Sequence, residues 1–114
     1  MDIKELRIGN FIQSHSFVCV TSLDGHFING YNIGSFAPIL LTEETILKCG
    51  FGEVGMYKNV YHKDNFRIVT GKKGKDCLFQ IFEDEDYVAI EISSVHQLQN
   101  LYFALTGKEL EVHL

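Results

Sequence analysis

The clearest hydrophobic pattern in the chain lies between Ser94 and Gly107. Four apolar side chains there are spaced as on one face of a helix: Leu98, Leu101, Tyr102 and Leu105. Ser94 and Gln97 have the spacing of a capping box, and Gly107 stands where helices often end in a left-handed residue. The pattern predicts a helix over 94–107 whose four apolar residues are buried and act as a structural anchor.

Shorter alternating runs predict strands on both sides of the centre of the chain. Residues 6–33 contain closely spaced apolar runs, with a tight hairpin turn at Asp24-Gly25 and one returning strand over 26–31. Such closely spaced strands favour a curled, SH3-like β-unit. Region 56–92 predicts an antiparallel meander of four strands: 56–61, 66–70, 77–82 and 87–92.

A short helix is predicted over 42–50, between these two regions. Thr42 is its cap, and Gly50 stands where it ends. Leu41, just before the cap, can pack on Ile46 as a hydrophobic staple. A helix this short depends on tertiary contacts for its stability.

Together these elements predict one α+β domain over residues 1–114, with the C-terminal helix packed on the sheet. Beyond Gly107, apolar residues alternate with polar ones at Leu110, Val112 and Leu114. This alternation predicts a short terminal strand docked on the protein's own sheet. A homodimer formed through that strand is the open alternative.

Composition narrows the class of protein. The net charge of −5 argues against general binding to nucleic acid or a membrane surface. No apolar run approaches the ~20 residues that span a bilayer, and the first residues lack the apolar core of a signal peptide. A cytoplasmic protein is therefore expected. Cys19, Cys49 and Cys77 form no C-x-x-C pair, which predicts buried free thiols.

A run of four carboxylates is the first candidate for chemistry, because hard cations prefer oxygen ligands: Glu83, Asp84, Glu85 and Asp86. The run lacks the spacing of a calcium loop, which favours a solvated hairpin turn. Alternate turns of a meander share one end, so His62 and Asp64 would lie on the same rim. A metal site could assemble only there.

A second candidate is a loop that contains two glycines and three lysines: Lys72, Lys73 and Lys75. It lacks the phosphate-loop spacing, and a strand is expected to follow it, so a plain hairpin loop is favoured. The histidines show no metal-ligand spacing, and no serine stands in a nucleophile elbow. The sequence therefore predicts no catalytic residue and no cofactor.

Three blocks, residues 3–10, 41–51 and 95–110, resemble a family of short hypothetical proteins common in gut Bacteroidales genomes and their prophages. The last block, with VHQLQNLYFALTG, is the most specific. The family has no established activity, so the resemblance implies an accessory protein of a phage or mobile element and assigns no site residues.

The leading hypothesis is therefore a non-enzymatic accessory protein that binds another protein. One alternative is a nucleic-acid-associated protein that uses the SH3-like unit and the lysine loop. The other is a metal-dependent enzyme built on the acidic rim.

Overall fold

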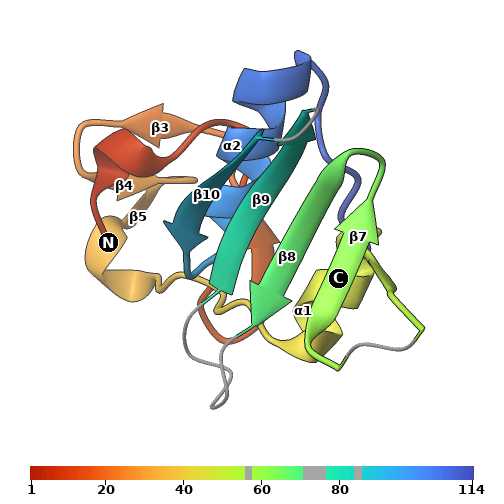
Figure 1. Cartoon of the computed structure of the whole chain (residues 1–114). Helices are drawn as coiled ribbons and strands as arrows, with labels where there is room; N and C mark the ends of the chain where they lie inside the picture. The colour runs from red at the N-terminus through yellow and green to blue at the C-terminus, as the bar shows by residue number, and fades with distance from the viewer. Residues whose placement is uncertain (56–57, 71–76, 84–85) are drawn as a thin grey trace. The chain divides into compact units, whose positions relative to one another are not determined.

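The computed structural model describes residues 1–55, 58–70, 77–83 and 86–114. In these residues ten strands form three antiparallel sheets, joined by a short helix and a C-terminal helix (Figure 1). The predicted α+β class is confirmed. Contacts divide the chain into two compact units. The N-terminal unit is Met1–Leu40 with Ser94–Leu110, and the meander unit is Leu41–Ser93 with Glu111–Leu114.

The N-terminal unit contains a two-stranded sheet and a three-stranded sheet, together with two 3-10 helices. Its elements before the long helix are η1 (Ile3–Glu5), β1 (Phe11–Gln13), β2 (Phe17–Cys19), β3 (Leu23–Asp24), β4 (Phe27–Ile28), β5 (Tyr31–Asn32) and η2 (Ile33–Ser35). Buried side chains from four of its segments form one core cluster: Leu6, Ile12, Val20 and Ile28. The SH3-like curl of this unit stays a prediction.

The hairpin predicted at Asp24-Gly25 is confirmed, because β3 pairs with β4 and Gly25 has a φ of +59°. The single strand predicted over 26–31 is wrong. It breaks at Asn29-Gly30, where both residues have positive φ (53° and 83°), and β5 pairs back on β4. Two positive φ values in succession are typical of a type I′ hairpin turn, which Asn-Gly strongly favours.

Helix α2 (Val95–Thr106) completes the N-terminal unit and begins and ends as predicted. Ser94 and Gln97 form the capping box, and Gly107 is left-handed with a φ of 73°. Leu98 and Tyr102 are buried and Leu101 is half-buried.

Leu105 is 44% exposed, so its predicted burial is wrong. Asn100 bonds to the N-terminal segment, and α2 packs on β1. Leu105 lies five positions further on, roughly 7.5 Å along the helix axis at 1.5 Å per residue. The last turn of α2 therefore extends beyond the contacts that bury its middle.

The meander unit is a five-stranded sheet in the order β10-β9-β8-β7-β6. Its strands are β6 (Gly52–Glu53), β7 (Val60–Lys63), β8 (Phe66–Thr70), β9 (Cys77–Glu83) and β10 (Asp86–Ile92). Three of the four predicted strands are confirmed to within a residue. The strand predicted over 56–61 starts only at Val60, after Asn59 with its left-handed φ of 64°, and residues 56–57 lie outside the described residues.

Helix α1 (Glu43–Lys48) confirms the predicted short helix. Thr42 caps it, and Thr45 rather than a glutamate closes the capping box. Leu41 and Ile46 are both buried, as a hydrophobic staple requires. Gly50, with a φ of 86°, follows the end of the helix.

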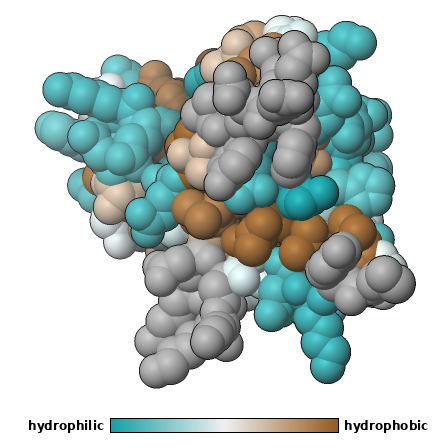
Figure 2. Space-filling model, viewed as in Figure 1, coloured by the Kyte–Doolittle hydropathy of each residue, from teal (hydrophilic) through white to brown (hydrophobic). Residues whose placement is uncertain are grey.

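The two faces of the meander sheet carry different sets of apolar side chains. Tyr61, Ile68 and Phe79 pair across β7, β8 and β9 and are buried on one face. On the other face, three apolar residues pair directly across the same strands: Val60, Val69 and Leu78. Figure 2 shows a band of apolar side chains crossing the viewed side of the molecule.

The predicted terminal strand over 110–114 is wrong, because these described residues adopt no strand. Leu110 is buried, and the amide of His113 donates to the carbonyl of Lys48 at 2.9 Å. The tail thus satisfies a carbonyl at the end of α1, which the helix itself leaves unpaired. In the described residues no helix is long and apolar enough to cross a membrane.

Candidate functional site

The proposed metal rim is only partly described. Asp84 and Glu85 lie outside the described residues, and Glu83 and Asp86 are placed by their backbone alone. The register puts the β7–β8 and β9–β10 turns at the same end of the sheet, as predicted. His62 and Asp64 are exposed there and line a cleft of ≈ 330 Å³.

The described strands that carry His62 and Asp86 are not neighbours in the sheet. β7 and β10 are separated by two strands, which corresponds to roughly 14 Å between them. Oxygen ligands must approach a cation to within about 2.6 Å. Within the described part of the chain, no three His, Cys, Asp or Glu side chains are grouped to hold a metal.

We therefore expect no saturable rise in melting temperature when Mg²⁺, Ca²⁺ or Zn²⁺ is added to the protein. A cation that binds the folded state would stabilise it in proportion to the logarithm of its concentration. Differential scanning fluorimetry over micromolar to millimolar metal measures this. A saturable rise that disappears in Asp84→Asn would restore the metal-enzyme hypothesis.

Lys72, Lys73 and Lys75 all fall in 71–76, outside the described residues. Their proposed role in nucleic-acid binding stays a prediction.

The first and last of the sequence blocks that carry the resemblance meet through Arg7 and Asn100. Arg7 Nε donates to Asn100 Oδ1 at 2.8 Å, and its guanidinium pairs with both oxygens of Glu109 at 2.6 and 3.3 Å. The guanidinium carbon lies 4.4 Å from the centre of the Phe103 ring. This geometry combines a bidentate ion pair with a cation–π contact. It holds the N-terminal segment against α2.

A buried amide completes this polar network. Gln99 is 1% exposed, accepts from the Phe11 amide at 2.8 Å and donates to the Gly9 carbonyl at 3.0 Å. Asn10 is also buried and donates to Asn100 Oδ1 at 2.8 Å. Sequence analysis missed these residues, since polar helix positions usually face water. Their hydrogen bonds within the chain indicate a structural role.

Ser94, His96 and Glu5 resemble the residues of a hydrolytic triad. Ser94 Oγ lies 3.2 Å from His96 Nδ1, and His96 Nε2 lies 3.6 Å from Glu5 Oε2. A nucleophilic serine must reach substrate, yet Ser94 is 2% exposed and its hydroxyl caps α2. Burial lowers the pKa of His96, and Glu5 only partly offsets this effect. The cluster therefore supports no hydrolytic reaction.

Cys49 and the buried Tyr61 offer no activated group either. Cys49 and Cys77 are buried free cysteines, as predicted, whereas Cys19 is half-buried. Burial raises the pKa of Cys49 to about 12, so it stays a thiol at neutral pH. Tyr61 lines a cleft of ≈ 430 Å³ in the meander unit. Burial raises its pKa, and the carboxylates of Glu43 and Glu53 raise it further.

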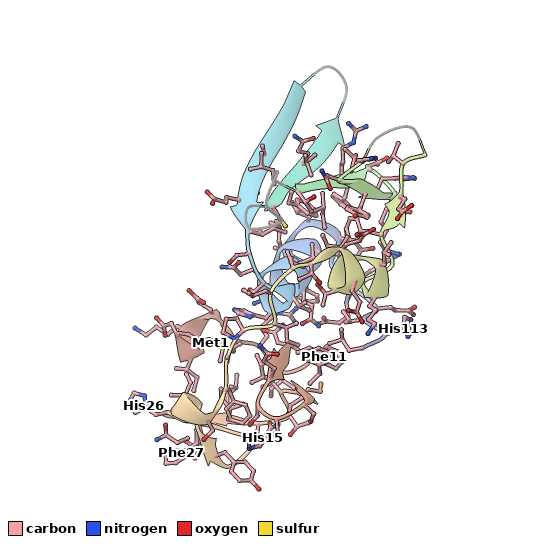
Figure 3. The ribbon with its side chains drawn as sticks, turned by 90° about the horizontal axis from the view of Figure 1, so that it is seen from below. Met1, Phe11, His15, His26, Phe27 and His113 are labelled. Atoms are coloured by element: carbon pink, nitrogen blue, oxygen red, sulfur yellow. The ribbon has the colours of Figure 1, made fainter. Side chains whose placement is uncertain are left out.

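The N-terminal unit carries a cleft of ≈ 360 Å³ with a different lining, which we name the Tyr31 cleft. Its described lining contains one histidine and no aspartate, glutamate, lysine or arginine. The lining residues are Ser14, His15, Ser16, Val18, Asn29, Tyr31, Ser35 and Phe36. Tyr31 is 67% exposed, and Val18 and Phe36 are half-buried. Figure 3 shows His15, His26 and Phe27 at one end of this unit, with Phe11 further in.

The turn at Asn29 places Tyr31 in the lining of the same cleft as Val18. Asn29 Oδ1 accepts from the amides of Thr21 and Ser22 at 2.7 and 3.1 Å, and its Nδ2 donates to the Cys19 carbonyl at 2.9 Å. These bonds tie the β4–β5 turn to the segment that follows β2. The Asn29-Gly30 dipeptide was the sequence signal that could have located this turn.

Comparison of the chain with protein-family models, with curated proteins and with solved structures found no match.

Proposed function

We propose that this chain is a non-enzymatic accessory protein that binds an extended segment of another protein in the Tyr31 cleft. The observation that carries the proposal is a tyrosine that is 67% exposed in the wall of a cleft. Exposed aromatic side chains are enriched where proteins bind one another, because they offer a large rigid surface at a small entropic cost.

The chemistry of the lining defines the occupant. Val18 and Phe36 supply apolar surface, and the serine hydroxyls on the rim can bond to a peptide backbone. No acidic or basic residue other than a histidine lines the described cleft. An uncharged segment that inserts one apolar side chain suits this environment better than a phosphate or a charged substrate.

The structure of the strands around the cleft also supports a binding role. β5 is a two-residue edge strand, too short to act as a template for aggregation but able to flank a bound segment. The origin in a phage or mobile element is part of the proposal and comes from the resemblance alone. The three lysines of the nucleic-acid alternative, and Asp84 and Glu85 of the metal-enzyme alternative, lie outside the described part of the chain.

A photo-crosslinking amino acid placed at position 31 tests the proposal in cells that naturally express the protein. The matched control carries the same group at Phe27, which is 49% exposed but does not line the described cleft. We expect one protein to cross-link from position 31 and not from position 27, and mass spectrometry identifies it.

The purified partner then allows a direct measurement by calorimetry. Tyr31→Ala is expected to weaken binding at least tenfold, as loss of an interface aromatic often does, whereas Phe27→Ala leaves it within about twofold. Equal cross-linking from both positions, or equal affinities of the two variants, would reject the cleft as the binding site.

A further inference from the structure

His96 is a buried titratable group in the first turn of α2, with 2% of its surface exposed. Ser94 Oγ lies 3.2 Å from Nδ1 and can donate its proton there. Nε2 is buried and has no hydrogen-bond partner among the described residues. Its neighbour Glu5 Oε2 is 3.6 Å away, too far for a hydrogen bond.

Four influences act on a proton added to His96. Burial in the unit and the positive end of the α2 dipole both disfavour the imidazolium. The carboxylate of Glu5 favours it, and the amino group of Met1 slightly disfavours it. Glu5 is about half exposed, so water weakens its attraction. The neutral form of His96 is therefore favoured while η1 is packed against α2.

The segment next to His96 has few buried contacts with the rest of the unit. η1 contains no buried residue. Its contacts with the rest of the unit include partial packing of Ile3 on the core and a 2.7 Å bond from Asn100 Nδ2 to the Glu5 carbonyl. Segments with few buried apolar contacts open at a lower free energy than the whole domain.

We propose that protonation of His96 releases η1 from α2, so that residues 2–5 form an acid-sensitive latch next to the buried Leu6. When the segment is released from α2, water can reach and solvate the imidazolium. When the segment is packed against α2, the imidazolium stays buried. The proposal is independent of the Tyr31 cleft.

The direction of the pH dependence follows from linkage. The pKa of His96 in the closed state lies below its ordinary value near 6.5, so the open state binds more protons below that pH. Closure is fully favoured above pH 6.5. Its equilibrium constant falls by up to about tenfold per pH unit as the pH drops toward the closed-state pKa.

Hydrogen exchange followed by NMR between pH 7.5 and 4.5 tests the latch in the full chain. The reporter is the amide of Leu6, which donates to the Ile3 carbonyl at 3.1 Å. The amide of Ile46 in α1, which donates to Thr42, is the internal control for unfolding elsewhere. We expect the protection factor of Leu6 to fall at least tenfold between pH 7 and pH 5, while that of Ile46 changes less than threefold.

Three variants separate the latch from other acid effects. His96→Gln should abolish the pH dependence at Leu6, and His15→Gln, at an exposed histidine, should leave it unchanged. Glu5→Gln removes the only attraction identified for the proton and should enlarge the loss of protection at pH 5. The proposal fails if wild-type protection rises on acidification, since Glu5 would then clamp the charged ring. It also fails if His96→Gln retains the wild-type profile.

Discussion

Replacing Leu98 by alanine is expected to lower the free energy of unfolding by about 2–5 kcal/mol. Leu98 is fully buried on α2, where it is the first residue of the apolar face that the sequence predicted. The substitution removes buried methyl groups and leaves a cavity that the surroundings can only partly fill. Chemical denaturation monitored by circular dichroism measures the change.

The matched control is Leu105→Ala, two helical turns further along the same predicted face. Leu105 is 44% exposed, so its truncation removes few packing contacts. We expect a loss below about 1 kcal/mol, with the good helix propensity of alanine offsetting part of it. Equal losses at the two positions would contradict the described burial of α2.

Replacing Gln99 by methionine is expected to cost about 2–4 kcal/mol, although the two side chains are similar in length. Methionine cannot accept strongly from the Phe11 amide or donate to the Gly9 carbonyl. Each buried polar group left unpaired costs roughly 1–3 kcal/mol. Two such groups in the N-terminal segment would lose their partner at once.

The same exchange at Gln80 is the control, because that glutamine is half-buried on β9. A change below about 1 kcal/mol is expected there. The free energy of unfolding of both variants can be measured by urea denaturation at pH 7.5, where His96 is neutral and the latch is closed. A Gln99→Met protein as stable as the wild type would show that β1 does not depend on this amide.

The polar network around α2 gives a structural role to the first and last of the three sequence blocks that carry the resemblance. Residues 3–10 and 95–110 are distant in the chain, yet Arg7 contacts Asn100, Phe103 and Glu109. The side chains in these two blocks therefore serve contacts between the ends of one unit. The Tyr31 cleft lies outside both blocks.

Local signals in the sequence determined both helices. Ser94, Gln97 and Gly107 define the ends of α2, and Thr42 and Gly50 define those of α1. Caps act through hydrogen bonds to backbone groups within three or four residues, so they can be recognised without the tertiary structure. The strands at 66–70, 77–82 and 87–92 followed equally from local alternation.

The candidate site depended on the tertiary structure. Tyr31 and Val18 come together only because Asn29 turns the chain and bonds to the Cys19 carbonyl. The burial of Gln99 and the exposure of Leu105 depend on where the N-terminal segment meets α2. Periodicity identifies which side chains share a helix face, but the partner that packs there decides how much of that face is buried. The sequence by itself determined the two helices with their ends and three strands of the meander, and long-range packing decided which of their side chains face solvent.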